Sequence, residues 1–380
     1  MTHAFRTFPR SAVSPRRQRG ISLLEMMVGI VIGLVCVLII VQTLSLWETR
    51  KRTVASGNDA QISGTLGSFL LDRDLRLAGY GIGLATSDVM GCDVIATKTG
   101  RSGGADFRFP LRPVEITKGT GAASDTVSVL YGNSTYFVSS QPMLATTATA
   151  AATTKRLKSR EGFQLGDKVV VTGNSPVDCQ LVEVTGQTLT EDTTIEHEAG
   201  KIYTTLAGVA KTATMNAAGG TGTTFTTGRV YNLGPTPARM IWSVTSGSLT
   251  HYNFIEDGDP TKAVVVASDA VTLKAQYGVD TSGNGKVESG EWYDTLPLTA
   301  NWTQVVAVRF GLLLRSRQQE RATSNVTPNA PEWAGGAFVM ANLDGSSGTA
   351  STPAADWRNY RYRVYENVVP LRNMIWGTAQ

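Results

Sequence analysis

The sequence predicts an α+β protein in which one long amino-terminal helix precedes a β-rich globular head with long loops. An apolar run and then a helical side-chain pattern follow one another without a break as far as Gly79. Beyond Gly79 the chain consists of short β-branched or aromatic runs bounded by Gly, Asn or Asp, which is typical of strands. Charged residues make up only 17% of the chain, and the abundant Ser, Thr, Gly and Ala favour polar connections between short strands.

Residues 1–20 form a basic leader that contains no acidic residue. The rest of the chain holds 30 of the 35 basic residues and all 31 acidic ones, so the net charge of +4 comes from this leader. The positive charge is therefore no argument for nucleic acid as a partner, and nucleic-acid binding is not expected. The leader holds five arginines: Arg6, Arg10, Arg16, Arg17 and Arg19.

Residues 21–47 are expected to form the transmembrane half of the helix. Every residue from Met26 to Val41 is apolar or glycine, and at about 1.5 Å per residue the run can cross a hydrocarbon core of about 30 Å. The leader arginines predict a cytoplasmic amino terminus. One carboxylate, Glu25, lies inside the run. A charge there raises the free energy of membrane insertion by roughly 2.5–3.5 kcal/mol, so we expect Glu25 to have a function.

Residues 48–79 are expected to form the amphipathic half of the same helix. Apolar side chains recur there at helical spacing and predict a stripe against which the head packs. Gly79 is well placed to end the helix as a left-handed cap. The residues at helical spacing are Val54, Ile62, Leu66, Phe69, Leu70, Arg73 and Leu77.

Residues 80–380 are expected to form the head, which would lie in the periplasm and later outside the cell. Its strand-like runs include "DTVSVLYG", "GDKVVVTG", "AVTLKAQYGVD" and "TQVVAVRFGLLLRS". Low-complexity tracts at 145–156, 211–228 and 342–356 are poor in large apolar residues, which predicts surface loops. A solvated loop is also expected for the basic run Lys155, Arg156, Lys158 and Arg160.

The stretch "RG-ISLLE" resembles the class III signal of type IV prepilins and pseudopilins. That resemblance implies cleavage between Gly20 and Ile21 by a prepilin peptidase, and N-methylation of Ile21. It also makes Glu25 the fifth residue of the mature chain, an assembly residue that neutralises the amino terminus of a neighbouring subunit. A plain single-span anchor explains the apolar run, but it explains neither Glu25 nor the glycine that ends the basic stretch.

"LDRDLRLAGYG" and the later blocks "YGVDTSGNGKVESGEW" and "VVPLRNMIW" resemble PilW-type minor pilins of the type IV pilus. The resemblance implies a role in pilus assembly or initiation, within a tip complex that serves adhesion, motility or DNA uptake. The implied partners are the other minor pilins, the major pilin, the inner-membrane assembly platform and a large tip adhesin. Two alternatives remain: a J-type minor pseudopilin of type II secretion, and a single-span periplasmic binding protein that never polymerises.

The segment 280–291, "DTSGNGKVESGE", fits the spacing of a calcium-binding loop with one substitution, a serine at the third position. Oxygen ligands at alternate positions and a final bidentate carboxylate suit Ca²⁺, which is therefore the one expected cofactor. A metal-free Gly/Asn-rich turn between two strands is the alternative. The candidate ligands are Asp280, Ser282, Asn284, the Lys286 carbonyl, Glu288 and Glu291.

The cysteines and histidines form no catalytic or zinc-binding pattern, so the sequence does not predict an enzyme. Cys36 lies in the apolar run as a small packing residue. Cys92 and Cys179 lie in the head, where an oxidising compartment would allow a disulfide between them. Two unpaired thiols are the alternative.

Overall fold

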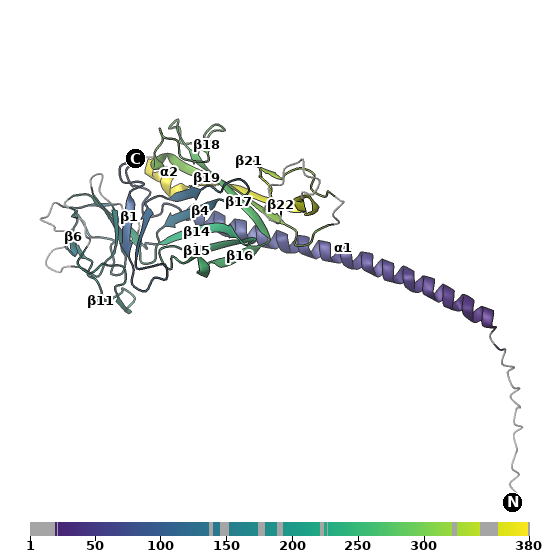
Figure 1. Ribbon diagram of the computed structural model, residues 1–380. Helices are drawn as coiled ribbons and strands as arrows, with labels where there is room; N and C mark the ends of the chain where they lie inside the picture. Colours follow the sequence, from purple (N-terminus) through teal and green to yellow (C-terminus); the bar gives the residue numbers. More distant parts are fainter. Residues whose placement is uncertain are drawn as a thin grey trace, which may run out of the picture. The chain divides into compact units, whose positions relative to one another are not determined.

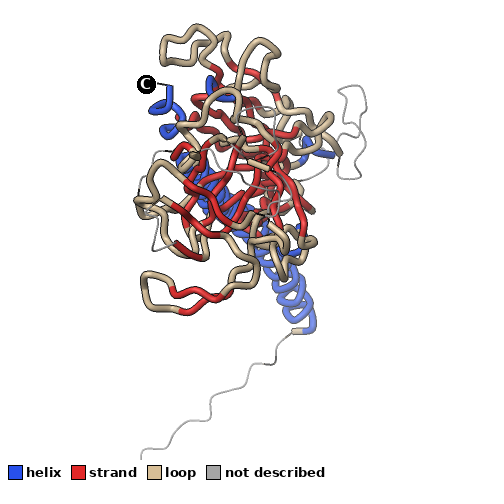
Figure 2. Tube along the Cα trace, turned by 90° about the vertical axis from the view of Figure 1, so that its left-hand side faces the viewer, coloured by secondary structure: helices blue, strands red, loops and turns tan. Residues whose placement is uncertain are grey.

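The computed structural model describes residues 20, 22–136, 140–144, 152–173, 179–187, 193–220, 224–225, 227–320, 325–342 and 356–378. The chain divides into two compact units, Met1–Ala55 and Ser56–Gln380. Helix α1 (Leu23–Leu77) contributes residues to both units, and strands dominate the second unit (Figures 1 and 2). The predicted fold class, a long amino-terminal helix followed by a β-rich head, is confirmed.

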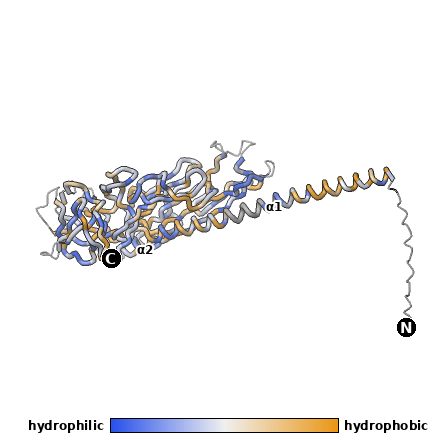
Figure 3. The backbone as a smooth tube through the Cα atoms, turned by 90° about the horizontal axis from the view of Figure 1, so that it is seen from below, coloured by the Kyte–Doolittle hydropathy of each residue, from blue (hydrophilic) through white to orange (hydrophobic). Residues whose placement is uncertain are grey.

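The first unit presents an uncovered apolar helix. From Leu23 to Ser45 the mean hydropathy is 2.9, and none of this segment is buried. The segment is long and apolar enough to cross a membrane, and Figure 3 shows its hydrophobic colouring. A helix that is apolar on all sides needs lipid or other apolar helices around it, because water would solvate it poorly.

Two sheets of the second unit lie against the carboxy-terminal half of α1. The first has the spatial order β16 (Val264–Ser268), β15 (Ser248–Asn253), β14 (Ala238–Thr245), β4 (Thr126–Tyr131) and β3 (Val114–Thr117). The second has the order β18 (Trp292–Tyr293), β17 (Ala270–Val279), β19 (Val305–Arg315) and β22 (Tyr362–Pro370). Neighbouring strands in both sheets are antiparallel.

A third sheet has the order β2 (Asp106–Pro110), β1 (Asp93–Thr97), β8 (Cys179–Glu183), β7 (Lys168–Thr172), β13 (Arg229–Gly234) and β5 (Gln141–Pro142). Its β1–β8 pair is parallel. A small sheet has the order β6 (Thr154–Arg156), β10 (Thr194–Glu196) and β9 (Gly186–Gln187). Two hairpins are β11 (Ile202–Thr204) with β12 (Ala210–Thr212), and β20 (Glu332–Trp333) with β21 (Gly336–Ala337). The short helices are the 3₁₀ turns η1 (Pro260–Lys262), η2 (Trp302–Gln304) and η3 (Asp356–Asn359), and the α-helix α2 (Arg372–Thr378).

The apolar stripe only partly predicted the face of α1 that packs against the head. Leu70 packs against the core as expected, but Ile62, Leu66 and Phe69 are 69%, 48% and 62% exposed, so for these three the expectation is wrong. The buried face carries small residues at Ala60, Gly64 and Gly67, and the large side chains of Leu71 and Leu75 nearer its end. A Cβ on Gly67 would lie 2.9 Å from Leu249 and 3.2 Å from Ala267, so only glycine lets these strands approach so closely.

The head contains two main hydrophobic cores, and β7 contributes to both. Val170 packs in the core that includes Leu71 of α1, whereas Val169 and Val171 pack in a second core. This alternation explains why three valines in a row are buried, because each face of the strand is covered.

Two buried residues correct the expectation that the low-complexity tracts are surface loops. Met215 and Phe225, in the tract 211–228, are 2% and 3% exposed; Met215 packs in the first core, and Phe225 packs in the second core with Phe163. Lys155 is also buried, and burial lowers its pKa to about 8. The large parts of the tracts at 145–151 and 343–355 lie outside the described residues.

Replacing Gly67 by leucine should destabilise the head, because the new side chain would overlap Leu249 and Ala267 of the adjoining strands. We expect a loss of about 1–3 kcal/mol in the free energy of unfolding and a lower melting temperature in detergent-solubilised protein. Thr65→Leu introduces the same side chain at an exposed position of α1 and is the matched control. Equal melting temperatures for the two variants would show that the close contact at Gly67 is unimportant.

Candidate functional site

The amino-terminal segment places Glu25 in the first turn of α1. Glu25 is exposed, as are the residues that follow it to Ser45, and Gly20 precedes the helix in an exposed position without regular structure. A carboxylate at a helix amino terminus is favourable because it faces the positive end of the helix dipole. Ile21, the predicted first residue of the mature chain, lies outside the described residues, so its processing stays a prediction.

A buried carboxylate, Asp74, joins the end of α1 to the head. Its side chain is fully buried and accepts hydrogen bonds from Trp242 Nε1 at 3.0 Å and from Arg73 at 3.0 Å. The Tyr131 hydroxyl lies 3.4 Å away, and burial, with the Asp74 charge as a second cause, raises the pKa of this tyrosine. Such a carboxylate fixes the rotation of α1 against β14 and β4, since a buried charge must keep its partners.

The end of α1 is closed by the carboxy-terminal segment. Gly79 adopts a φ of 78°, the left-handed conformation expected of the capping glycine, and its amide donates to the Leu130 carbonyl at 2.9 Å. The Asn373 side chain, from α2, donates to the carbonyls of Leu77 and Ala78 at 3.2 and 3.0 Å. The sequence blocks "LDRDLRLAGYG" and "VVPLRNMIW" therefore meet in space, although Leu77 and Asn373 are 296 positions apart.

The 280–291 loop connects β17 to β18, so a strand rather than a helix enters it. Asp280 is 9% exposed and its carboxylate accepts from the backbone amides of Asn284 and Gly285 at 3.1 and 2.8 Å. The Ser282 hydroxyl donates to the same carboxylate at 3.3 Å. These bonds turn the loop back over Asp280.

Glu291 closes the other end of the loop. It accepts from the Thr281 hydroxyl at 2.6 Å and amide at 2.9 Å, and from the amides of Ser282 and Glu288 at 3.1 and 2.9 Å. The hydrogen bond from the Thr281 hydroxyl is the largest cause that holds the pKa of Glu291 at about 2, so the carboxylate stays charged over a wide pH range. The loop is thus closed by its own hydrogen bonds.

The other candidate ligands lie on the exposed surface of the loop. Asn284 bridges two of them, since its side chain donates to Glu288 at 3.0 Å and accepts from the Lys286 amide at 2.9 Å. Within the described part of the chain, no three His, Cys, Asp or Glu side chains are grouped closely enough to hold a metal. The residue types and spacing suit Ca²⁺, but in this arrangement amide hydrogens occupy the carboxylates that would bind it.

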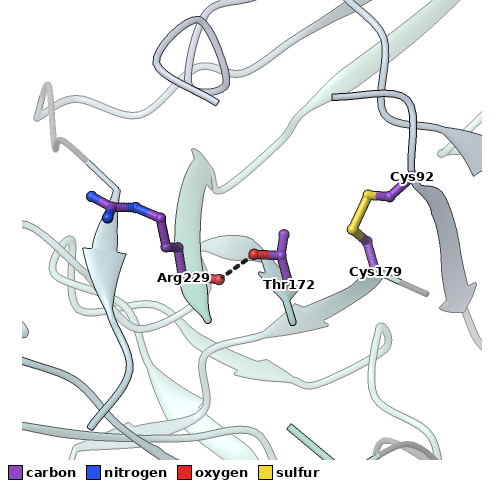
Figure 4. The surroundings of a disulfide bond; sticks show 4 residues. All are labelled: Cys92, Thr172, Cys179 and Arg229. Atoms are coloured by element: carbon purple, nitrogen blue, oxygen red, sulfur yellow. Dashed lines mark hydrogen bonds between the residues drawn. A yellow bond between two sulfur atoms is a disulfide. The ribbon is translucent and has the colours of Figure 1, made fainter. Parts of the chain in front are cut away.

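Cys92 and Cys179 are joined by a disulfide in the structure, with their Cα atoms 5.9 Å apart (Figure 4). The bond ties the residue before β1 to the first residue of β8, at the start of the parallel strand pair. Parallel pairing of β1 and β8 brings together segments 87 residues apart, which is entropically costly. The hydrogen bond from Thr172 to the Arg229 carbonyl, drawn beside it, joins β7 to β13 of the same sheet.

Sequence reasoning did not assign roles to Asp74 and Asn373. Both are polar residues that connect segments distant along the chain, and the helical spacing of apolar residues cannot reveal such residues. The only signal was indirect, because each lies in a block that carries the family resemblance.

Comparison with known families supports the resemblance at both ends of the chain. Residues 241–373 match the family model described as type IV pilus-assembly protein W, and residues 15–41 match the prokaryotic N-terminal methylation motif. No curated protein and no solved structure matches the chain. The first match contains Trp242, the 280–291 loop and Asn373, and the second contains Gly20 and Glu25. The resemblance to PilW-type minor pilins is thereby confirmed.

Removing the disulfide should destabilise the head. In the chain-entropy description, a bond that closes a loop of this length contributes about 4–5 kcal/mol. We expect dithiothreitol, or the double change Cys92→Ser with Cys179→Ser, to lower the melting temperature by roughly 10 °C.

Cys36→Ser is the matched control, because it removes a cysteine outside the disulfide. Alkylation of all three cysteines without reductant, or an unchanged melting temperature on reduction, would contradict the expectation.

Proposed function

We propose that this PilW-type pilin is a minor subunit of a type IV pilus, which acts in pilus assembly and initiation. In this proposal the chain is made as a prepilin, cut between Gly20 and Ile21 by a prepilin peptidase and methylated on Ile21. It then leaves the inner membrane for the filament. The match to the N-terminal methylation motif, which spans these residues, supports the proposed processing.

One observation carries the proposal: an uncovered apolar helix bears a carboxylate in its first turn. Within a bilayer or a filament core, this charge needs a partner of opposite sign, since a lone charge in a medium of low dielectric constant is costly. Cleavage before Ile21 would create a positive amino group. The Glu25 carboxylate of one subunit would pair with the amino group of its neighbour and set their axial offset.

The second unit offers a surface for the same assembly. Ile62, Leu66 and Phe69 form an exposed stripe along one face of α1. An exposed apolar stripe at helical spacing favours contact with another helix. The occupant would be an apolar helix of a neighbouring pilin, either the major pilin or another minor pilin.

Before assembly, we place the chain in the inner membrane with its amino terminus in the cytoplasm and its head in the periplasm. The apolar helix and the basic leader support this orientation. Its further partners would be the inner-membrane assembly platform and a large tip adhesin. In a tip complex the subunit would serve adhesion, motility or DNA uptake, through structural contacts and without catalysis.

Two other functions would use the same helix. A minor pseudopilin of type II secretion carries the same kind of processing signal, but the match of residues 241–373 to pilus-assembly protein W favours the pilus. A single-span periplasmic binding protein would retain its leader and would have no need for Glu25. The methylation motif favours a processed subunit over this alternative.

We also propose that the 280–291 loop binds Ca²⁺. The support is the spacing of its oxygen-bearing residues and the burial of Asp280 and Glu291 at the two ends. Binding would require the amide hydrogen bonds to these carboxylates to be exchanged in part for bonds to the ion. The ion would offset the repulsion among the three carboxylates of the loop, which belong to Asp280, Glu288 and Glu291.

Replacing Glu25 by glutamine should abolish incorporation into filaments while leaving the protein in the membrane, because the side chain keeps its size and loses its charge. We expect at least a tenfold drop in the amount recovered in sheared pili, which corresponds to about 1.4 kcal/mol or more. Glu48→Gln, a neutralised carboxylate beyond the apolar segment, is the control. Recovery of the Glu25 variant at wild-type levels would contradict the proposal.

The calcium proposal predicts that EDTA lowers the melting temperature of detergent-solubilised protein and that added Ca²⁺ restores it. The combined change Asp280→Asn with Glu291→Gln should remove this calcium dependence, because both ends of the ligand set lose their charge. Asp294→Asn, which neutralises a carboxylate outside the loop, should retain it. A wild-type melting temperature that is the same in EDTA and in Ca²⁺ would eliminate the site.

A further inference from the structure

A polar pocket opens in the head, away from the residues discussed above. It encloses about 300 Å³ and lies where the β11–β12 hairpin meets the β13–β14 turn and the segment after β15. This volume is at the lower end of the range of small-molecule sites, about 300–1,000 Å³. Three lysines line the pocket: Lys98, Lys168 and Lys211.

The buried side of the pocket, its floor, is built around Glu183, whose carboxylate has all its hydrogen bonds made within the protein. Glu183 is 1% exposed and accepts hydrogen bonds from the Tyr203 hydroxyl, from Lys168 Nζ at 3.1 Å, and from the amides of Thr214 and Met215 at 2.8 and 3.0 Å. Both carboxylate oxygens of Glu183 have partners, and the ion pair with Glu183 neutralises the charge of Lys168. The hydrogen bonds hold the chain after β12 in place and so preorganise the wall of the pocket.

Two further ammonium groups can receive an anion at the rim. Lys98 Nζ contacts the Glu256 carboxylate at 2.6 Å and the Glu256 carbonyl at 2.8 Å. The Glu256 side chain is 68% exposed, so it can turn into solvent and release Lys98 at little cost. Lys211 is exposed and has no acidic partner among the described residues.

The remaining walls combine apolar and hydroxyl groups. Met215, Ile255 and Pro235 give apolar surface, while Thr212 and Thr214 add hydroxyls. The lining suits a ligand that offers a negative group to the lysines, hydroxyls to the threonines, and an apolar face to the remaining wall. We infer that this pocket binds an acidic sugar through its carboxylate, with Glu256 as the internal group that the sugar carboxylate displaces.

This inference does not rest on the proposed assembly role, and it can be tested by titrating detergent-solubilised full-length protein. Saturation-transfer NMR with galacturonate should give a Kd of about 1 mM or tighter, and at least tenfold weaker binding of galactose, which lacks the carboxylate. The monoamide of N-acetylglutamate carries one carboxylate but no sugar ring, and it should also bind at least tenfold more weakly than galacturonate.

Two variants should shift the affinity in opposite directions. Lys211→Gln should weaken galacturonate binding about tenfold, because a charged hydrogen bond is lost. Glu256→Gln should strengthen it severalfold, because the competing carboxylate is gone. Lys158→Gln, at an exposed lysine of the head that does not line the pocket, is the matched control and should bind as the wild type does.

The opposite signs keep the test independent of folding defects, which would weaken binding in both variants. Equal affinity for galactose, equal affinity for the glutamate amide, or a change of the same sign in both variants would overturn the inference. So would the absence of galacturonate binding at concentrations up to about 10 mM.

Discussion

The structure depends first on a constraint at its amino-terminal end: a long apolar helix with one carboxylate must be surrounded by something other than water. From Leu23 to Ser45 no side chain in the described part of the chain covers it. Lipid can cover the apolar groups, but it cannot neutralise Glu25. A cationic group within the apolar phase would offset that charge, and the amino terminus that the proposed processing creates on a neighbouring subunit would be such a group.

In the second unit the same helix is covered on one side, because the strands of the head pack against it. Between Ala60 and Gly67 the side of α1 toward the head carries small residues, so the strands approach its backbone closely. Further along, Leu71 and Leu75 enter the core, and Asp74 fixes the rotation of the helix through Trp242. The larger apolar residues Ile62 and Phe69 remain outside. The helix therefore has one face that completes the head and another that is available for contacts between subunits.

Much of this fold could be predicted from sequence, and the failures have physical causes. The helix and its end at Gly79 follow from local spacing and capping, and the apolar runs of the head marked its main strands. The face of the helix that packs against the head was predicted only in part, because hydrophobic spacing does not register glycines such as Gly67, which allow close approach of the strands. The burial of Phe225 in the second core and of Met215 in the first was missed because both are isolated in a tract of small residues, and only tertiary contacts reveal that they are buried. Asp74 and Asn373 were missed because their partners lie far away in sequence.

The pairing of charges proposed for the filament requires that the chain begin at residue 21, since an intact leader would leave no amino group beside the apolar run. Mass spectrometry of the protein recovered from membranes and from sheared pili measures this directly. The proposed function predicts one mature species in both fractions that starts at Ile21 and carries a single added methyl group. A chain that retains residues 1–20 in the membrane and is absent from pili would contradict it.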